Sequence, residues 1–436
     1  MSLHTSTHPS RRHKPVIAFL TDFWTNIDDR IREGKRPGGT ASVWRIWEEC
    51  QNEGFEVHVF VVAKLPDDWP KQTTALGGVV FHWIREPLLG LTQRLQKLGL
   101  QGIFTPHWPL RQAAMAWRLL TCGVRPNILY MMRRSFLLVG LAASCLLRAK
   151  RVVRLYGTWI YHLWFTQRKW RPRLKEIGGL AELCLPADLL IMTNDGTSGE
   201  KAARWVGVDM RKFRFWLNGT DKAMHVAEFD AAGFKKKLGM TPNDPMLMTL
   251  GRLADWKRQD RLIDAMPAIV KEYPAAKLFL VGGGPMRDAL EQRARSTGVG
   301  ESVVFVGAVG HDQIREYLNA CDVYAQAFDV SNLSNTLIEA LTAGCCIVTR
   351  DVGSTTELVT DGQNAVVLRP GEADEYAEAI LRLLRNPDER QRLARAAYEY
   401  AMKHFQTWEE RMAMEVRELR NLLPKCKASS KQPTHS

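Results

Sequence analysis

The sequence predicts an α/β protein made of two doubly wound domains in series. Short runs rich in Val, Ile, Leu and Phe recur along the chain, and amphipathic stretches separate them, as expected of buried parallel strands joined by crossover helices. A length of 436 residues with 45% hydrophobic residues is enough for two or three domains that each bury a core. This composition excludes a disordered chain and a small disulfide-stabilised protein.

The strands and helices alternate in the order that a parallel sheet requires. In the first half we expect strands at 15–20, 56–62, 79–84, 127–132, 151–156, 189–193 and 213–217. In the second half they fall at 246–250, 277–281, 303–306, 323–326, 346–349 and 365–368. Helices fit between them at 41–52, 113–121, 262–272, 286–296, 312–320, 335–342 and 373–384.

The division between the domains falls near Asn218 and Gly219, which follow a strand and supply turn chemistry. We therefore expect an N-terminal domain at 14–218 and a C-terminal domain at 219–405, facing a central cleft that is a natural ligand site. A helical pattern at 406–424 predicts a helix that crosses back to the N-terminal domain. Residues 1–13 are expected to be flexible, and 425–436 have the composition of disorder.

The net charge of +13 lies entirely in the first half of the chain. Residues 1–220 contain 32 Lys and Arg against 17 Asp and Glu, whereas residues 221–436 contain 28 against 30. Between Glu86 and Glu176 there are 16 basic residues and no acidic one. This segment is expected to meet something anionic.

The chain carries no pattern typical of export, membrane spanning or a structural metal. No apolar stretch of signal-peptide length follows the basic residues near the N-terminus, so we expect a cytoplasmic protein. The longest apolar run, 135–147, predicts a buried helix because a spanning helix needs about 20 residues. The eight cysteines include no C-x-x-C pair, which makes a zinc site or a disulfide framework improbable.

Two glycine-rich turns precede helices. In RPGGT at 36–40 the glycines would let backbone amides approach an anion, although a Gly-Gly turn that enters a helix is also a common structural device. In VGGGP at 281–285 a plain tight turn is the better interpretation, because Arg287 stands where a dinucleotide fingerprint has its third glycine.

Two cations follow the first strand of the C-terminal domain. Arg252 and Lys257 leave the edge at which α/β sheets bind ligands, and a guanidinium with an ammonium suits a diphosphate. The alternative is a solvated basic loop, since Arg258 and Arg261 lie close by.

A helix that begins after Ser334 carries the other candidate groups. Ser334 is a good N-cap, and Gly344 is expected to end the helix, so the first amides face the cleft. Glu339 lies in the apolar stretch LIEAL, where a buried carboxylate needs donors such as two sugar hydroxyls. The alternative is an exposed Glu on a polar helix face.

Five motifs occur in order along the second half of the chain. They are NGTD at 218–221, GRL at 251–253 with the following Lys257, VGGGP at 281–285, FVG at 305–307 and NLSNTLIEALTAG at 332–344. In order and spacing they resemble the retaining nucleotide-sugar glycosyltransferases of the GT-B fold, the group 1 (family 4) class. The resemblance implies two Rossmann-like domains, with the acceptor on the N-terminal one and the donor on the C-terminal one.

The resemblance also assigns roles to residues. Arg252 and Lys257 would bind the donor diphosphate, Glu339 would bind the ribose hydroxyls, and these three would be the catalytic residues. The other donor contacts implied are Gly39, the backbone amides of Asn335 and Thr336, and Val309 beside the nucleobase. No metal and no cofactor are expected, because the cations would neutralise the leaving diphosphate.

The chain departs from the family pattern at two places. Ser331 stands at the donor-binding position where the family has the first of two glutamates, and Asp329 or Asn332 could substitute for that carboxylate. The family often has a His at a strand end of the N-terminal domain, where this chain reads RLYGTW. The acceptor-side candidates are therefore Tyr156, Gly157, Thr158 and His162.

These features lead to one expected activity. A sugar would pass with retention from a UDP- or GDP-sugar to a hydroxyl of an anionic glycan or lipid-linked acceptor, as in the assembly of cell-envelope polysaccharide. The protein would be cytoplasmic, with peripheral contact to the inner face of an anionic membrane and no nucleic acid partner. The alternatives are a sugar-nucleotide 2-epimerase, a phosphorylase-like enzyme, or a basic protein that binds polyanions or membrane surfaces.

Overall fold

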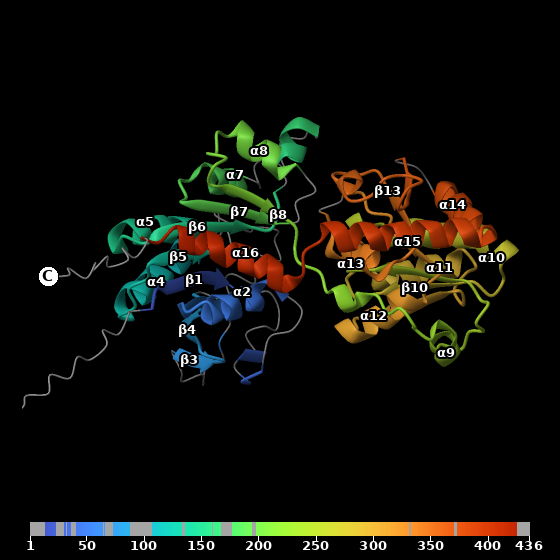
Figure 1. Ribbon diagram of the computed structural model, residues 1–436, viewed down its shortest axis with the longest axis horizontal. Helices are drawn as coiled ribbons and strands as arrows, with labels where there is room; N and C mark the ends of the chain where they lie inside the picture. Colours follow the sequence, from blue (N-terminus) through green and yellow to red (C-terminus); the bar gives the residue numbers. More distant parts are fainter. Residues whose placement is uncertain are drawn as a thin grey trace, which may run out of the picture.

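The structure is a computed structural model in which two α/β domains lie side by side (Figure 1). It describes residues 14–22, 30–31, 33–35, 41–63, 65, 73–87, 107–132, 136–158, 160–166, 177–193, 198–330, 333–369 and 373–424. No helix within these ranges is long and apolar enough to span a membrane.

The N-terminal sheet has eight strands in the order β3-β4-β2-β1-β5-β6-β7-β8, all parallel except β3. The strands are β1 (Val16–Asp22), β2 (Glu56–Ala63), β3 (Thr73–Leu76), β4 (Val79–Arg85), β5 (Ile128–Met131), β6 (Lys150–Leu155), β7 (Leu189–Thr193) and β8 (Phe213–Trp216). The chain winds outward from β1 in one direction and then from β5 in the other. The order therefore reverses between β1 and β5, as in doubly wound sheets.

The C-terminal sheet has six parallel strands in the order β11-β10-β9-β12-β13-β14. They are β9 (Met246–Leu250), β10 (Lys277–Val281), β11 (Val303–Gly307), β12 (Val323–Ala325), β13 (Ile347–Arg350) and β14 (Val366–Leu368). Here the order reverses between β9 and β12, so the crevice at their carboxyl ends is the place where such sheets bind ligands.

Helices cover both faces of each sheet. In the N-terminal domain they are α2 (Ala41–Asn52), α4 (His107–Thr121), α5 (Leu137–Leu147), a π-helix at His162–Thr166, α7 (Ile177–Cys184) and α8 (Gly199–Trp205). In the C-terminal domain they are α9 (Ala231–Lys237), α10 (Gln259–Glu272), α11 (Arg287–Ser296), α12 (His311–Ala320), α13 (Asn335–Ala343), α14 (Ala373–Arg385) and α15 (Pro387–His404). The last helix, α16 (Trp408–Asn421), packs with α2 on one face of the N-terminal sheet, and α4 and α5 pack on the other (Figure 1).

The predicted strands and helices are confirmed, with ends that mostly differ by one to three residues. The largest difference is α4, which starts at 107 instead of 113 because Pro109 is tolerated in the first turn of a helix. The sequence prediction missed β3, whose four residues TTAL lack strand alternation, as well as α7, α8 and α9. It also missed α15, a strongly polar helix that buries only a narrow row of Leu393, Ala397 and Ala401.

The chain crosses between the domains twice, and the two crossings lie next to each other. Thr220 N donates a hydrogen bond to the carbonyl oxygen of Gln406 at 2.9 Å, and Thr220 pairs with Thr407 as an isolated parallel bridge. A side chain at Gly219 would collide with the backbone of Trp408. Glycine at this position therefore permits the close approach of the two crossings.

A buried ionic network fixes α16 to the N-terminal sheet. Glu415 accepts hydrogen bonds from Arg411 Nη1 at 2.8 Å, from Arg154 Nη1 at 3.3 Å, and from the hydroxyl of Tyr130. The side chains of Arg154, Arg411 and Glu415 are all 0% exposed. Burial opposes ionisation of Glu415, but the two arginines outweigh it and hold the pKa of Glu415 below its usual value.

We expect Glu415→Gln to destabilise the protein by about 3 to 5 kcal/mol, because two buried guanidinium groups lose their only carboxylate in the described part of the chain. The measurement is urea unfolding followed by circular dichroism. Glu418→Gln is the matched control. Glu418 lies on the same helix as Glu415, is partly exposed and pairs with Arg214 of β8, so its loss should cost about 1 kcal/mol or less. Equal effects of the two variants would contradict the assigned role of the network.

Candidate functional site

The predicted donor-side residues meet at the carboxyl ends of β9 and β12. Arg252 and Lys257 follow β9, and Ser334 and α13 follow β12. This is the point at which the strand order of the C-terminal sheet reverses. The structure therefore brings together, at one crevice, groups that lie about 80 residues apart in the sequence.

Lys257 is a buried cation that two aromatic rings enclose. Lys257 is only 7% exposed, and its Nζ lies 3.4 Å from the ring centre of Phe328 and 4.2 Å from that of Trp256. The two rings contact each other edge to face, with centres 5.8 Å apart. Ring faces attract an ammonium group, but they do not neutralise its charge.

Neither cation has a carboxylate partner within the described residues. Lys257 and the guanidinium of Arg252 make no ion pair there. Burial without a counter-ion lowers the pKa of Lys257 to about 7. A diphosphate would supply the missing negative charge, which favours the ligand-binding interpretation of this loop over the solvated basic loop.

The glycines of VGGGP allow the adjacent loops to touch through their backbones. A Cβ at Gly282 would collide with Gly251, and one at Gly284 would collide with Leu253. Leu253 N donates to the carbonyl oxygen of Gly283 at 3.0 Å. This motif therefore shapes the loop that carries Arg252, in agreement with its interpretation as a tight structural turn.

The first turn of α13 presents backbone amides at the crevice. Ser334 is the N-cap and accepts a hydrogen bond from Leu337 N, as predicted. The amides of Asn335 and Thr336 belong to the first turn, where helix geometry provides no intrahelical acceptor. The side chain of Asn335 accepts a hydrogen bond from Asn218 Nδ2 at 3.1 Å, which joins this turn to the domain crossing.

Glu339 lines a small pocket beside the domain crossings. The lining residues are Gly219, Thr220, Asp221, His311, Asn335, Ile338, Glu339 and Trp408. The carboxylate makes no hydrogen bond or ion pair to the described residues, and burial raises its pKa to about 7. It is therefore not an exposed Glu on a polar face, and a ligand hydroxyl could satisfy it.

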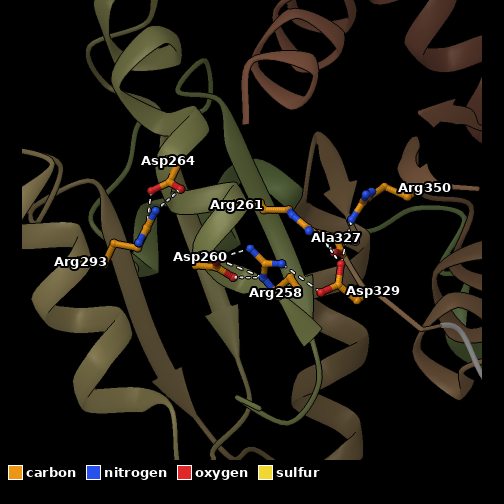
Figure 2. A network of polar contacts seen from close by, with 8 residues as sticks. All are labelled: Arg258, Asp260, Arg261, Asp264, Arg293, Ala327, Asp329 and Arg350. Atoms are coloured by element: carbon orange, nitrogen blue, oxygen red, sulfur yellow. Dashed lines mark hydrogen bonds and ion pairs between the residues drawn. The ribbon is translucent and has the colours of Figure 1, made fainter. Parts of the chain in front are cut away.

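Asp329 is held by arginines rather than left available to a ligand. Figure 2 shows its carboxylate contacting Arg258 Nη1 at 3.0 Å, Arg261 Nη1 at 2.6 Å and Arg350 Nη1 at 3.2 Å. Burial alone would raise the pKa of Asp329, but the hydrogen bonds from Arg258 and Arg261 outweigh it and hold the pKa below its usual value. These ion pairs give Asp329 a structural role, and its substitution for the first family glutamate remains a prediction.

This network holds together the two loops that enclose Lys257. Asp329 N donates a hydrogen bond to the carbonyl oxygen of Trp256 at 3.0 Å, next to the ion pair with Arg258. Of the two rings that enclose Lys257, Trp256 directly precedes Lys257 in the sequence and Phe328 directly precedes Asp329. Sequence reasoning missed both rings, although an aromatic residue directly before Lys257 was a visible signal.

The remaining candidates lie elsewhere or outside the described residues. Val309 follows β11 and packs, partly buried, against the core between that sheet and α12 and α13. Tyr156, Gly157 and Thr158 follow β6 of the N-terminal sheet, and His162 begins the π-helix. Gly39, Ser331 and Asn332 fall outside the described residues.

Thr158 has a local structural contact: its Oγ1 accepts a hydrogen bond from Ile160 N at 3.3 Å. Tyr156 lies under the guanidinium of Arg154, 5.2 Å from the ring centre, and so adjoins the buried network of α16. The described residues include no group of three or more His, Cys, Asp or Glu side chains placed to hold a metal ion. The expected independence from metals remains a prediction.

The comparisons with known proteins agree with this geometry. Residues 231–400 match the model of the glycosyl transferases group 1 family, and this segment contains Arg252, Lys257 and Glu339. This segment of the C-terminal domain is thus similar to that family. The donor-side motifs recognised in the sequence lie within the matched segment or directly before it.

Curated relatives include a GDP-mannose-dependent alpha-(1-6)-phosphatidylinositol monomannoside mannosyltransferase of Mycobacterium tuberculosis, 31% identical over 33% of this chain and 39% of the relative. A lipopolysaccharide core biosynthesis glycosyltransferase of Rhizobium meliloti is 29% identical over 39% of this chain and 48% of the relative. The similarity therefore spans less than half the length of these two enzymes.

Solved structures similar to the chain cover both domains. HepE of Anabaena, in complex with UDP-glucose, matches with a TM-score of 0.66 and 21% identity over 94% of this chain and 100% of that one. WaaG, a glycosyltransferase involved in lipopolysaccharide biosynthesis, matches with a TM-score of 0.64 and 17% identity over 92% of this chain and 99% of that one. The fold of the chain is GT-B, as the sequence predicted.

We expect the affinity for a UDP- or GDP-sugar to fall above about pH 7, approaching tenfold per pH unit, because Lys257 then loses the proton that the diphosphate requires. Isothermal titration calorimetry between pH 6 and pH 9 measures this decline. Lys257→Arg is the matched variant, because arginine stays charged throughout and should remove the decline. A decline that persists in this variant would assign it to another group.

We expect Asp329→Asn to lower stability by about 1 kcal/mol, with the partial exposure of the carboxylate limiting the loss, and to weaken nucleotide affinity several-fold because the loops around Lys257 loosen. Thermal unfolding and calorimetry measure the two effects. Asp264→Asn is the control, since Asp264 pairs with Arg293 in the same view but outside the crevice (Figure 2). A loss of turnover with unchanged stability and affinity would instead restore Asp329 as a ligand of the donor sugar.

Proposed function

We propose that the protein is a retaining glycosyltransferase that moves a sugar from a nucleoside-diphosphate sugar to an acceptor hydroxyl. The observation that carries the proposal is the pair Arg252 and Lys257, which lie at the ligand-binding edge of a doubly wound sheet without any carboxylate partner in the described residues. The family match over residues 231–400 supports the same activity.

Each group has a task in the proposed reaction. The guanidinium of Arg252 and the ammonium of Lys257 bind the diphosphate and stabilise the charge that develops as the bond to the sugar breaks. The amides of Asn335 and Thr336 bind phosphate oxygens at the start of α13. Glu339 accepts hydrogen bonds from the ribose hydroxyls.

Retention follows from attack on the same face of the sugar that the diphosphate leaves. The departing phosphate oxygen takes the proton of the acceptor hydroxyl while the acceptor oxygen bonds to the anomeric carbon. Arg252 and Lys257 lower the energy of this step because they neutralise the departing diphosphate. We propose that the reaction needs no metal, since these fixed cations do the work that a metal ion would do.

The donor is proposed to be a UDP- or GDP-sugar. HepE of Anabaena binds UDP-glucose, and the mycobacterial relative is GDP-mannose-dependent. The chain shares the fold of the first and is 31% identical to the second over 33% of its own length. Both nucleotides suit a crevice that recognises the diphosphate and the ribose.

The acceptor is proposed to be an anionic glycan or lipid-linked molecule bound at the N-terminal domain. That domain carries the whole excess of positive charge, and its candidate acceptor residues are Tyr156, Gly157, Thr158 and His162. The relatives from Mycobacterium and Rhizobium act on a phosphatidylinositol mannoside and in lipopolysaccharide core biosynthesis, according to their names. These names support a role in making a cell-envelope glycan.

We expect Arg252→Ala and Lys257→Ala each to reduce turnover by about 10² to 10³, because each removes one donor of charge to the leaving group. Consumption of UDP- and GDP-sugars with a panel of glycan and lipid-linked acceptors measures the effect. Arg293→Ala is the control, since Arg293 pairs with Asp264 and takes no part in the ion pairs of Asp329. Wild-type rates in both variants would contradict the proposal, and conversion of the donor without any acceptor would indicate an epimerase.

A further inference from the structure

Large apolar side chains are exposed on two neighbouring helices of the N-terminal domain. On α4, Trp117 is 73% exposed, and on α5, Leu146 is 68% and Leu138 is 51% exposed. Leu110 and Leu120 on α4 are also exposed. Most of the exposed large apolar residues of the described chain lie in the N-terminal domain, and these two helices carry five of them.

The helix α5 is apolar on both of its sides. Its sequence LLVGLAASCLL contains no charged residue. One side, with Val139 and Ala143, packs into the core beneath the sheet, and the other, with Leu138 and Leu146, faces outward. A helix of this composition is normally covered on both sides, and none of the described residues covers the outward side.

The outward sides of α4 and α5 form one surface, which we call the α4–α5 face and define by Leu110, Trp117, Leu120, Leu138 and Leu146. Both helices pack on the same face of the N-terminal sheet, α4 through Met115 and Leu119, and they contact each other. Figure 1 shows them at the end of the domain that points away from the C-terminal domain. The face is therefore accessible whatever occupies the crevice.

Basic residues border this face. Arg125 follows α4, Arg148 ends α5 and Lys150 begins β6, and all three are exposed. Arg125 and Arg148 have no ion pair within the described residues, while Lys150 lies 3.3 Å from Asp188. No acidic residue occurs between Glu86 and Glu176, so nothing in this stretch of sequence offsets the positive charge.

We propose that the α4–α5 face docks the protein onto a membrane surface that contains anionic lipids. Leucine and tryptophan side chains enter the boundary between headgroups and acyl chains, where tryptophan is favoured, while arginines at the rim meet the lipid phosphates. A helix of 11 residues is about 16 Å long, half the thickness of a bilayer core, so α5 lies along the surface instead of crossing it.

Charge complementarity favours lipid over a protein partner or a second copy of this chain. Two copies meeting through this face would carry the positive charges of Arg125, Arg148 and Lys150 on both partners, and residues 87–175 contain no acidic residue to meet them. A lipid bilayer supplies both a flat apolar layer and a layer of phosphates. The inference rests on the proposed function only in that a lipid-linked acceptor would then be near, and the docking itself does not depend on catalysis.

The test is co-sedimentation of the full chain with two kinds of vesicle, at low and at high salt. One kind is phosphatidylcholine alone, and the other is phosphatidylcholine with about 30% phosphatidylglycerol. We expect binding to the anionic vesicles at low salt. Binding should be much weaker to the neutral vesicles, and much weaker to the anionic vesicles at about 0.5 M NaCl. A double variant, Trp117→Ala with Leu146→Ser, should reduce partitioning by about tenfold.

Trp205→Ala is the matched control, because Trp205 is exposed on α8 in the same domain and outside the α4–α5 face. It should bind as the wild type does. Thermal stabilisation by UDP- or GDP-sugar, measured on the same proteins without vesicles, reports the donor site separately and should be unchanged in the double variant. Failure of that stabilisation in the wild type would count against the proposed function and not against the docking.

Three outcomes would overturn the proposal. The wild type could fail to bind anionic vesicles at low salt, or the double variant could bind them as well as the wild type does. The wild type could also form a dimer in solution that the double variant does not form, which would make the face an interface between two copies. Light scattering coupled to size-exclusion chromatography measures the last of these.

Discussion

The crevice at the carboxyl ends of β9 and β12 depends on a lysine that is buried without a counter-ion among the described residues. A protein interior does not normally hold an ammonium group away from both water and carboxylates, because the desolvation is unfavourable. At Lys257 the faces of Trp256 and Phe328 lessen this cost, and the low pKa shows that they do not remove it. The neighbouring carboxylate, Asp329, is occupied by arginines and leaves the charge to be met by a ligand.

The opposite wall of the crevice is a helix that also contacts the link between the domains. Asn335 at the start of α13 accepts a hydrogen bond from Asn218, and the hydroxyls of Thr342 near its end and Thr220 lie 3.0 Å apart. Glu339 lies between these two attachments and faces the pocket beside Gly219. Helix α13 is thus fixed to the two domain crossings as well as to its own sheet.

Most of the fold could be predicted from the sequence because each strand is an apolar run bounded by turn residues. The strands buried on both faces, such as β2 and β9, stand out in this way, whereas β3 at the sheet edge has only four residues and no such pattern. The polar helix α15 was missed for a similar reason, since its buried row consists mainly of alanines that carry little signal.

The candidate site could likewise be predicted only in part from the sequence. Arg252, Lys257 and the start of α13 were predictable because each follows a strand whose carboxyl end was visible in the sequence. The rings around Lys257 and the arginines around Asp329 were not, because they depend on how closely two loops approach in space, and Arg258 and Asp329 are separated by 71 positions. Burial and pairing of this kind belong to tertiary structure and leave no local pattern.

The buried network of α16 has a consequence for how the chain is made. Arg154 and Tyr130 leave the ribosome 261 and 285 residues ahead of Glu415, and the entire C-terminal domain is synthesised in between. Until α16 arrives, Arg154 has no carboxylate partner among the described residues, and the part of the sheet that α16 covers beside α2 lacks that cover. The domain that begins first is therefore finished last, and the C-terminal domain can be complete before the N-terminal domain receives its final helix.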